Sequence, residues 1–91
     1  MTVLDLRALP RSERREALEG LVVAEVKTGL LMPGDEELPV DESFFELGLT
    51  SLGLQDVGSR LEAALGRRIA STDLFNNPTV ERLVEHLSEE A

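Results

Sequence analysis

The sequence predicts an all-α fold, a small bundle of three main helices plus one short helix. Three stretches repeat apolar residues at the spacing of a single helix face. The long segment between the first two of them lacks the alternation typical of strands. A length of 91 residues suits one small domain, 1–91, with a core from about residue 6 to residue 87.

The first main helix should begin near Pro10-Arg11-Ser12. Ser12 is the expected cap, and Glu13 falls in the first turn, where an acid is favourable. The buried stripe of this helix comprises Leu18, Leu21, Val22 and Val26. Gly29 and Pro33-Gly34 should end it.

A long loop, from Leu31 to Gly48, should connect the first and second main helices. It contains two prolines and a run of acids. We expect Phe44, Phe45 and Leu47 to pack part of it onto the core. Long ordered loops of this kind are often functional.

The second main helix should start at Thr50 or Ser51 and end near Gly66. The residues that share its inner face are Leu54, Val57, Gly58, Leu61 and Leu65. A glycine on this face would allow a neighbouring helix to approach closely. The residues that point outward are Leu52, Asp56 and Ser59.

The C-terminal third predicts two more helices. A short turn of helix should run from Ser71 to Phe75, and the last main helix should open at Pro78-Thr79 with Thr79 as its cap. Its buried stripe comprises Val80, Leu83, Val84 and Leu87.

Composition excludes several classes of function. The net charge of −9 argues against nucleic acid and against anionic membrane surfaces as partners. No apolar run is long enough to span a membrane, and the N-terminus lacks the pattern of a signal peptide. The absence of cysteine rules out disulfides and thiolate metal sites. We expect a cytoplasmic monomer.

The charges are unevenly distributed along the chain. No lysine or arginine occurs from Thr28 to Ser59. The acids in this stretch are Asp35, Glu36, Glu37, Asp41, Glu42, Glu46 and Asp56. They either keep the surface soluble by repulsion or attract basic partners.

Catalysis by this chain and calcium binding are both disfavoured. His86, the one histidine, falls between the apolar positions of the last helix, so we expect it to face solvent rather than serve as a general base. The window from Asp35 to Glu46 has the length of a calcium loop. Its sixth position, however, is Val40, where such a loop needs glycine.

Ser51 and Leu52 form the most informative pair in the chain. Ser51 could be only a helix cap, and Leu52 only a single exposed apolar residue. Together they place a hydroxyl and an apolar side chain at the positive end of a helix, which stabilises a phosphate group. A phosphodiester on Ser51 would therefore be well placed.

The run Phe44-Phe45-Glu46-Leu47-Gly48-Leu49-Thr50-Ser51-Leu52 resembles the phosphopantetheine attachment motif of acyl and peptidyl carrier proteins. That motif has an aromatic residue followed by Gly, a hydrophobic residue, Asp, Ser and Leu. The other matching segments are Leu61-Glu62, Leu65-Gly66, Phe75-Asn76-Asn77-Pro78-Thr79-Val80, and Leu9-Pro10 with Glu13-Arg14. The resemblance covers nearly the whole chain.

The resemblance implies that Ser51 is the covalent attachment residue for 4′-phosphopantetheine. A phosphopantetheinyl transferase would supply this arm from coenzyme A, and the arm's thiol would carry acyl cargo as thioesters. The implied partners are ketosynthase, acyltransferase and other synthase domains. The chain would be a non-catalytic carrier without a metal site.

Two positions depart from the family pattern. Thr50 stands where the motif has Asp, which bears on transferase preference, and Gln55 replaces an apolar residue. Leu49 replaces the second glycine of peptidyl carriers and favours an acyl carrier domain of polyketide biosynthesis. The alternatives are a peptidyl or aryl carrier domain of nonribosomal peptide synthesis and an unmodified helical protein-interaction module.

Overall fold

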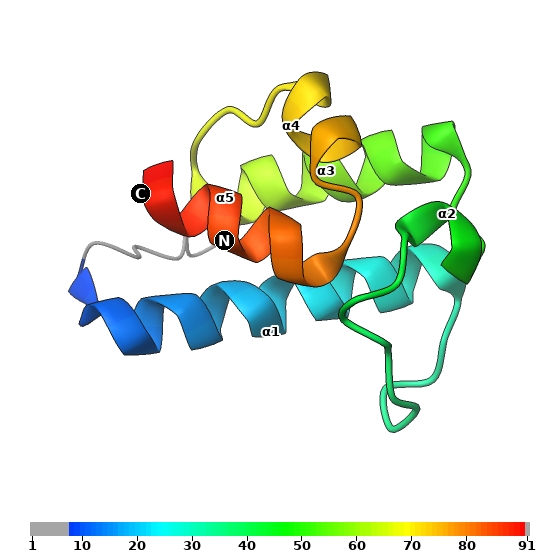
Figure 1. Cartoon of the computed structure of the whole chain (residues 1–91), viewed down its shortest axis with the longest axis horizontal. Coiled ribbons are helices and arrows are strands. Elements are labelled where there is room, and N and C mark those ends of the chain that lie inside the picture. The colour runs from blue at the N-terminus through cyan, green and yellow to red at the C-terminus, as the bar shows by residue number, and fades with distance from the viewer. Residues whose placement is uncertain (1–7, 91) are drawn as a thin grey trace.

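The computed structural model describes residues 8–90, and each regular element in this range is a helix (Figure 1). The elements are α1 (Arg11–Leu30), α2 (Phe44–Leu47), α3 (Ser51–Leu65), α4 (Ser71–Asn76) and α5 (Val80–Glu90). The all-α prediction is confirmed, with α1, α3 and α5 as the three main helices. The short helix α2 is an addition that the sequence pattern did not predict. The expected start of the core, at residue 6, lies outside the described residues.

The start of α1 differs from the prediction. The N–H of Arg14 donates to the carbonyl of Pro10 at 2.8 Å, which puts Pro10 at the N-cap. No side-chain hydrogen bond caps this helix end, and Ser12 lies inside the helix. The predicted cap at Ser12 is therefore wrong. Proline has no side-chain oxygen that could accept from the N–H groups of the first turn, so α1 begins without a side-chain cap.

The end of α1 falls within the predicted region, since the helix ends at Leu30, between Gly29 and Pro33-Gly34. The helix continues through Gly29 and is closed by Leu31, which adopts a left-handed conformation (φ 56°) and donates its N–H to Thr28 at 3.2 Å. A Cβ added to Gly29 would lie 3.2 Å from a methyl of Leu49 and 3.3 Å from one of Val57. Gly29 therefore allows the region around α3 to pack closely on α1, and it does not terminate the helix.

The core lies where α1 meets α3 and α5. The five predicted inner-face residues of α3 and the four of α5 are buried. On α1 three of the four predicted residues are buried, while Leu21 is partly buried against the core. The helical spacing of apolar residues thus identified the core correctly.

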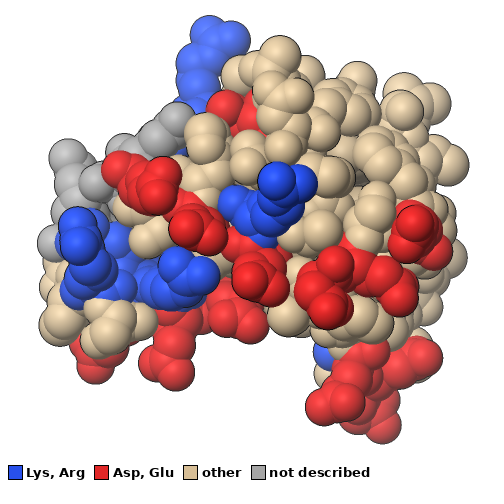
Figure 2. Space-filling view, viewed as in Figure 1, with Lys and Arg blue, Asp and Glu red and all other residues tan. Residues whose placement is uncertain are grey.

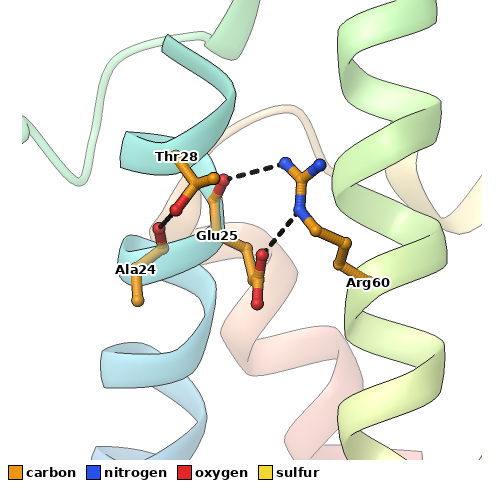
Figure 3. A network of polar contacts seen from close by, with 4 residues as sticks. All are labelled: Ala24, Glu25, Thr28 and Arg60. Atoms are coloured by element: carbon orange, nitrogen blue, oxygen red, sulfur yellow. Dashed lines mark hydrogen bonds and ion pairs between the residues drawn. The ribbon is translucent and has the colours of Figure 1, made fainter. Parts of the chain in front are cut away.

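A polar clamp joins α1 to α3 (Figure 3). Arg60 Nε donates to Glu25 Oε1 at 2.7 Å, and a second guanidinium nitrogen of Arg60 donates to the Glu25 carbonyl at 3.3 Å. One turn along α1, the Thr28 hydroxyl donates to the Ala24 carbonyl at 2.9 Å. Because this ion pair is partly exposed, it contributes about 1 kcal/mol or less. It specifies how α3 lies along α1.

The loop between α1 and α2 is tied to the start of α5. The N–H of Glu81 donates to the Val40 carbonyl at 3.0 Å, and the N–H of Phe44 donates to the Pro78 carbonyl at 2.7 Å. Leu38, a residue of this loop, is buried in the core. These contacts fix the chain that leads to α2, as expected for an ordered loop.

Candidate functional site

A tight turn leads from α2 to Ser51. Gly48 closes α2 with φ 115°, a conformation that glycine adopts without steric cost. Its N–H donates to the Phe45 carbonyl at 3.2 Å, and the Leu49 N–H donates to the Phe44 carbonyl at 3.0 Å. The turn places Ser51 at the first position of α3.

The cap of α3 is Thr50 and not Ser51. The Thr50 hydroxyl accepts a hydrogen bond from the Gly53 N–H at 3.0 Å. The backbone N–H groups of Ser51 and Leu52 have no intrahelical acceptor, as is usual in a first turn. The Ser51 side chain is exposed and makes no hydrogen bond within the part of the chain that the structure describes. Ser51 is therefore not needed to start the helix.

The electrostatic setting favours an anion at Ser51 and a basic partner around it. The N-terminus of α3 carries the positive end of the helix dipole. The surface of the surrounding segments is acidic, and Figure 2 shows acidic side chains gathered over the loop that follows α1. The exposed acids are Asp35, Glu36, Glu37, Asp41, Glu42, Glu46 and Asp56.

The outer face of α3 is free, as predicted. The side chain of Leu52 is 75% exposed, directly beside Ser51. The other exposed residues on this face are Gln55, Asp56 and Ser59. A leucine held in water beside a free hydroxyl is available to a partner protein.

Two aromatic residues near the site were missed by the sequence reasoning. Phe45 was expected to pack onto the core, but it is 42% exposed, and its ring stacks on Phe75 with centroids 6.0 Å apart and planes 12° apart. The prediction for Phe45 is wrong because successive residues of a helical turn point about 100° apart. Phe44 enters the core and is fully buried, so Phe45 must face outward. The adjacent pair of phenylalanines was the available signal.

The short helix α4 brings Phe75 to this position. Leu74 points into α3, where a Cβ added to Gly58 would lie 2.5 Å from its Cδ1. Asp73 points to α5 and its Oδ1 lies 2.8 Å from His86 Nε2. The glycine notch predicted on α3 is thus filled by α4. His86 is partly buried and paired with Asp73, so the expectation of a solvent-facing histidine is wrong.

The contact between α4 and α5 lowers the pKa of one side chain, that of Asp73. The hydrogen bond from His86 lowers the pKa of Asp73 below its ordinary value of 3.8, and burial opposes this shift. The Ala70 N–H, which donates to Asp73 Oδ2 at 2.9 Å, also lowers this pKa. The carboxylate is charged at neutral pH and holds α4 at its start. Its role is to fix α4, and thereby Phe75.

Neither a metal cluster nor a membrane helix is present in the described part of the chain. Among residues 8–90, no three side chains of Asp, Glu, His or Cys gather closely enough to hold a metal ion. Across the same range, no helix combines the length and the apolar character needed to cross a membrane.

A family model described as a phosphopantetheine attachment site matches residues 22–87. A spectinabilin polyketide synthase system protein, NorA′, from Streptomyces orinoci is 41% identical over 83 residues. The erythronolide synthase EryA3 from Saccharopolyspora erythraea is 39% identical over 75 residues. These matches cover 91% and 82% of this chain, yet the chain spans 2% of the length of each relative.

Two solved structures share the fold. An A1-type acyl carrier protein domain from module 5 of MLSA1 superposes with a TM-score of 0.80 at 33% identity, over 92% of this chain and 84% of that one. BlmI, a type II acyl carrier protein from Streptomyces verticillus involved in bleomycin biosynthesis, gives a TM-score of 0.78 at 25% identity. That match covers 90% of this chain and 98% of BlmI. With the family model spanning most of the sequence, the chain belongs to the phosphopantetheine attachment family and is a carrier domain of the acyl carrier protein type.

Proposed function

We propose that the chain is an acyl carrier domain of polyketide biosynthesis and that Ser51 bears its 4′-phosphopantetheine arm. The observation that supports this most is the exposed, unbonded Ser51 hydroxyl at the N-terminus of α3, within the described residues. The polyketide synthase relatives support the pathway. Leu49, in the place of the second glycine of peptidyl carriers, agrees with it.

The residues around Ser51 fit a phosphodiester. Its negative charge would lie beside the N–H groups of Ser51 and Leu52, which have no intrahelical acceptor. Interaction of such a charge with the helix dipole contributes about 0.3–1 kcal/mol. Thr50 caps α3 through its own hydroxyl, so modification of Ser51 leaves the cap intact.

When bound, the arm supplies a thiol that holds acyl groups as thioesters, a group that this cysteine-free chain lacks. The chain itself contributes the Ser51 hydroxyl to the transfer reaction and exposes it to solvent. In the transfer, this oxygen loses its proton and forms a new bond to the phosphorus of coenzyme A that carries the pantetheine, while adenosine 3′,5′-bisphosphate leaves. The Ser51 hydroxyl makes no hydrogen bond with another described residue. We expect the transferase to supply the base, and the chain to act as the carrier of the arm.

The partners we propose are a phosphopantetheinyl transferase and then ketosynthase, acyltransferase and other synthase domains. The outer face of α3 would meet them through Leu52, with Asp56 and Ser59 farther along the helix. The exposed acids of the loop before α2, of α2 and of α3 favour partners with basic surfaces. The chain matches a small fraction of each long relative, so these partners are expected in other parts of a synthase or in separate enzymes.

Intact-protein mass spectrometry tests this proposal. Incubation with coenzyme A and a broad-specificity phosphopantetheinyl transferase should add the mass of one arm, and the Ser51→Ala variant should stay at its apo mass. Ser12→Ala, which removes an exposed serine of α1 outside this face, is the matched control and should be modified fully. A Ser51→Ala protein that still gains the arm would overturn the assignment. Wild-type protein that is never modified but binds a partner tightly would instead support an interaction module.

A further inference from the structure

The described residues include four large apolar side chains that are exposed: Leu31, Phe45, Leu52 and Phe75. Two of them, Phe45 and Phe75, form one stacked pair with ring centroids 6.0 Å apart. They come from two short helices, α2 and α4, that are far apart along the chain. Grouped aromatic side chains at a surface are typical of the centre of a protein–protein interface.

The aromatic pair is held in place by contacts behind it. Phe44 anchors α2 in the core, and its N–H is bonded to Pro78 at 2.7 Å. On α4, Leu74 fills the notch at Gly58 and Asp73 pairs with His86. Rings that are already fixed lose little conformational entropy when a partner covers them. The pair is therefore preorganised for docking.

The charges beside Phe45 indicate the chemistry of the partner. Glu42 and Glu46 are exposed on and just before α2, and no Lys or Arg occurs from Thr28 to Ser59. A complementary surface would present an apolar pocket or side chain edged by lysine or arginine. A second copy of this chain fits poorly because it would bring the same acids and a net charge of −9.

The pair also lies close enough to Ser51 to share an interface with it. The Gly48 N–H is 3.2 Å from the Phe45 carbonyl, and Ser51 follows Gly48 by three residues, so the backbones of Phe45 and Ser51 are within about 16 Å. A protein interface of standard size buries about 800 Å² on each partner, a disc with a radius of about 16 Å. An enzyme seated over Ser51 would thus reach the aromatic pair.

We propose that Phe45 and Phe75 form the apolar centre of a docking surface for the phosphopantetheinyl transferase, separate from the outer face of α3. This inference rests on the proposed function of Ser51. The transferase is the partner that must bring its active site to the Ser51 oxygen itself. Enzymes that act on the thioester meet the far end of the arm and can approach from other directions.

The test compares transfer rates to wild-type protein, Phe45→Ala, Phe75→Ala and the double variant, with a broad-specificity transferase as the probe. Far-UV circular dichroism and thermal unfolding establish that each variant is folded. The double variant should reach complete modification at Ser51, but with kcat/KM lowered about thirtyfold, the size of a hot-spot truncation. Ser12→Ala, which alters an exposed side chain in the first turn of α1, at the end of that helix far from α2, is the control and should react at the wild-type rate (Figure 1).

A charge variant separates the contribution of the acidic side chains to docking from that of the aromatic pair. Glu46→Gln should lower kcat/KM at low salt and weaken its dependence on ionic strength, whereas the double phenylalanine variant should keep that dependence. A folded double variant that is modified at the wild-type rate would overturn the docking surface and leave the proposed function intact. Wild-type protein that stays at its apo mass would overturn the proposed function itself. Self-association of wild-type protein that is lost in the double variant would identify the surface as a contact between copies and would also overturn the proposal.

Discussion

The inner and outer faces of α3 are built in opposite ways. The inner residues, Leu54, Val57, Gly58, Leu61 and Leu65, are buried against neighbouring helices. The outer residues, Ser51, Leu52, Gln55, Asp56 and Ser59, are exposed. The inner face therefore fixes where Ser51 is held, and the outer face is left for partners to recognise. Stability and recognition should respond to separate substitutions on one helix.

The inner face also shapes the surface beyond α3. Leu74 packs at Gly58, and the next residue of α4, Phe75, stacks on Phe45. A glycine on the buried side of α3 thus determines where an exposed aromatic pair lies. The position of the proposed docking surface therefore depends on buried packing that a partner protein would not contact.

Two leucines on opposite faces of α3 give the largest expected contrast. Leu54→Ala should lower the free energy of unfolding by about 2–5 kcal/mol, because Leu54 is fully buried and its truncation leaves a cavity. Leu52→Ala should change it by less than about 0.5 kcal/mol, because Leu52 is 75% exposed. Urea unfolding measures both, and transfer kinetics should show slower arm attachment to Leu52→Ala. A loss of several kcal/mol for Leu52→Ala would mean that the two faces are wrongly assigned.

Two glycines test the notch in the inner face. Gly58→Ala should destabilise the protein by about 1–3 kcal/mol, because the new methyl would lie 2.5 Å from Leu74 Cδ1 and the buried leucine must shift. Gly20→Ala on α1 is the control, since its Cβ would meet no atom within 4 Å. It should stabilise the protein by about 0.5–1 kcal/mol through helix propensity. Thermal unfolding of both variants decides the question, and a stabilised Gly58→Ala protein would show that the notch is not tightly packed.

The N-cap of α3 should contribute less to the free energy of unfolding than these buried contacts do. Thr50→Ala removes the hydroxyl that accepts from Gly53 and should cost about 1 kcal/mol. Thr50→Asp restores the residue usual in the family and should recover this loss, because aspartate caps well and carries a charge favourable at a helix N-terminus. Chemical denaturation of the apo proteins provides the comparison. Equal stability of the alanine and aspartate variants would argue against the cap as the source of the difference.

The smallest expected effect is the pH dependence of the α4–α5 contact. The pKa of Asp73 is lowered below 3.8 in the folded protein, so its contribution to stability is present above pH 3.8 and is lost as pH falls through the folded-state pKa. In His86→Ala the pKa of Asp73 should rise toward 3.8. Titration of the Asp73 carboxyl carbon by NMR measures this directly. A pKa unchanged by removal of His86 would show that the Ala70 N–H, and not the histidine, stabilises the carboxylate.

Most of the helical framework could be predicted because it depends on local pattern. Apolar spacing identified the buried faces of α3 and α5, and Thr79 caps α5 by accepting from the Arg82 N–H at 3.1 Å, as expected. The start of α3 was also correct, since Thr50 is a good cap and Ser51 follows it. Each of these features is determined by residues that lie close together in the sequence.

The features that were missed depend on contacts between distant segments. His86 meets Asp73 because α4 folds back on α5, and no periodicity within α5 reveals a partner 13 residues away. Phe45 finds Phe75 in the same way, across two short helices. The side chains of Leu49 and Val57 that lie close to Gly29 likewise come from outside α1, and the sequence pattern did not predict this contact. Tertiary contacts overrode the local signal at His86 and Phe45.

The most direct test is to locate the arm on the chain. Protein modified in the presence of coenzyme A and a transferase is digested, and the peptides are sequenced by tandem mass spectrometry. The arm should be found on Ser51 and on none of the other exposed serines, such as Ser59 or Ser71. An arm on any other residue, with Ser51 unmodified, would contradict it.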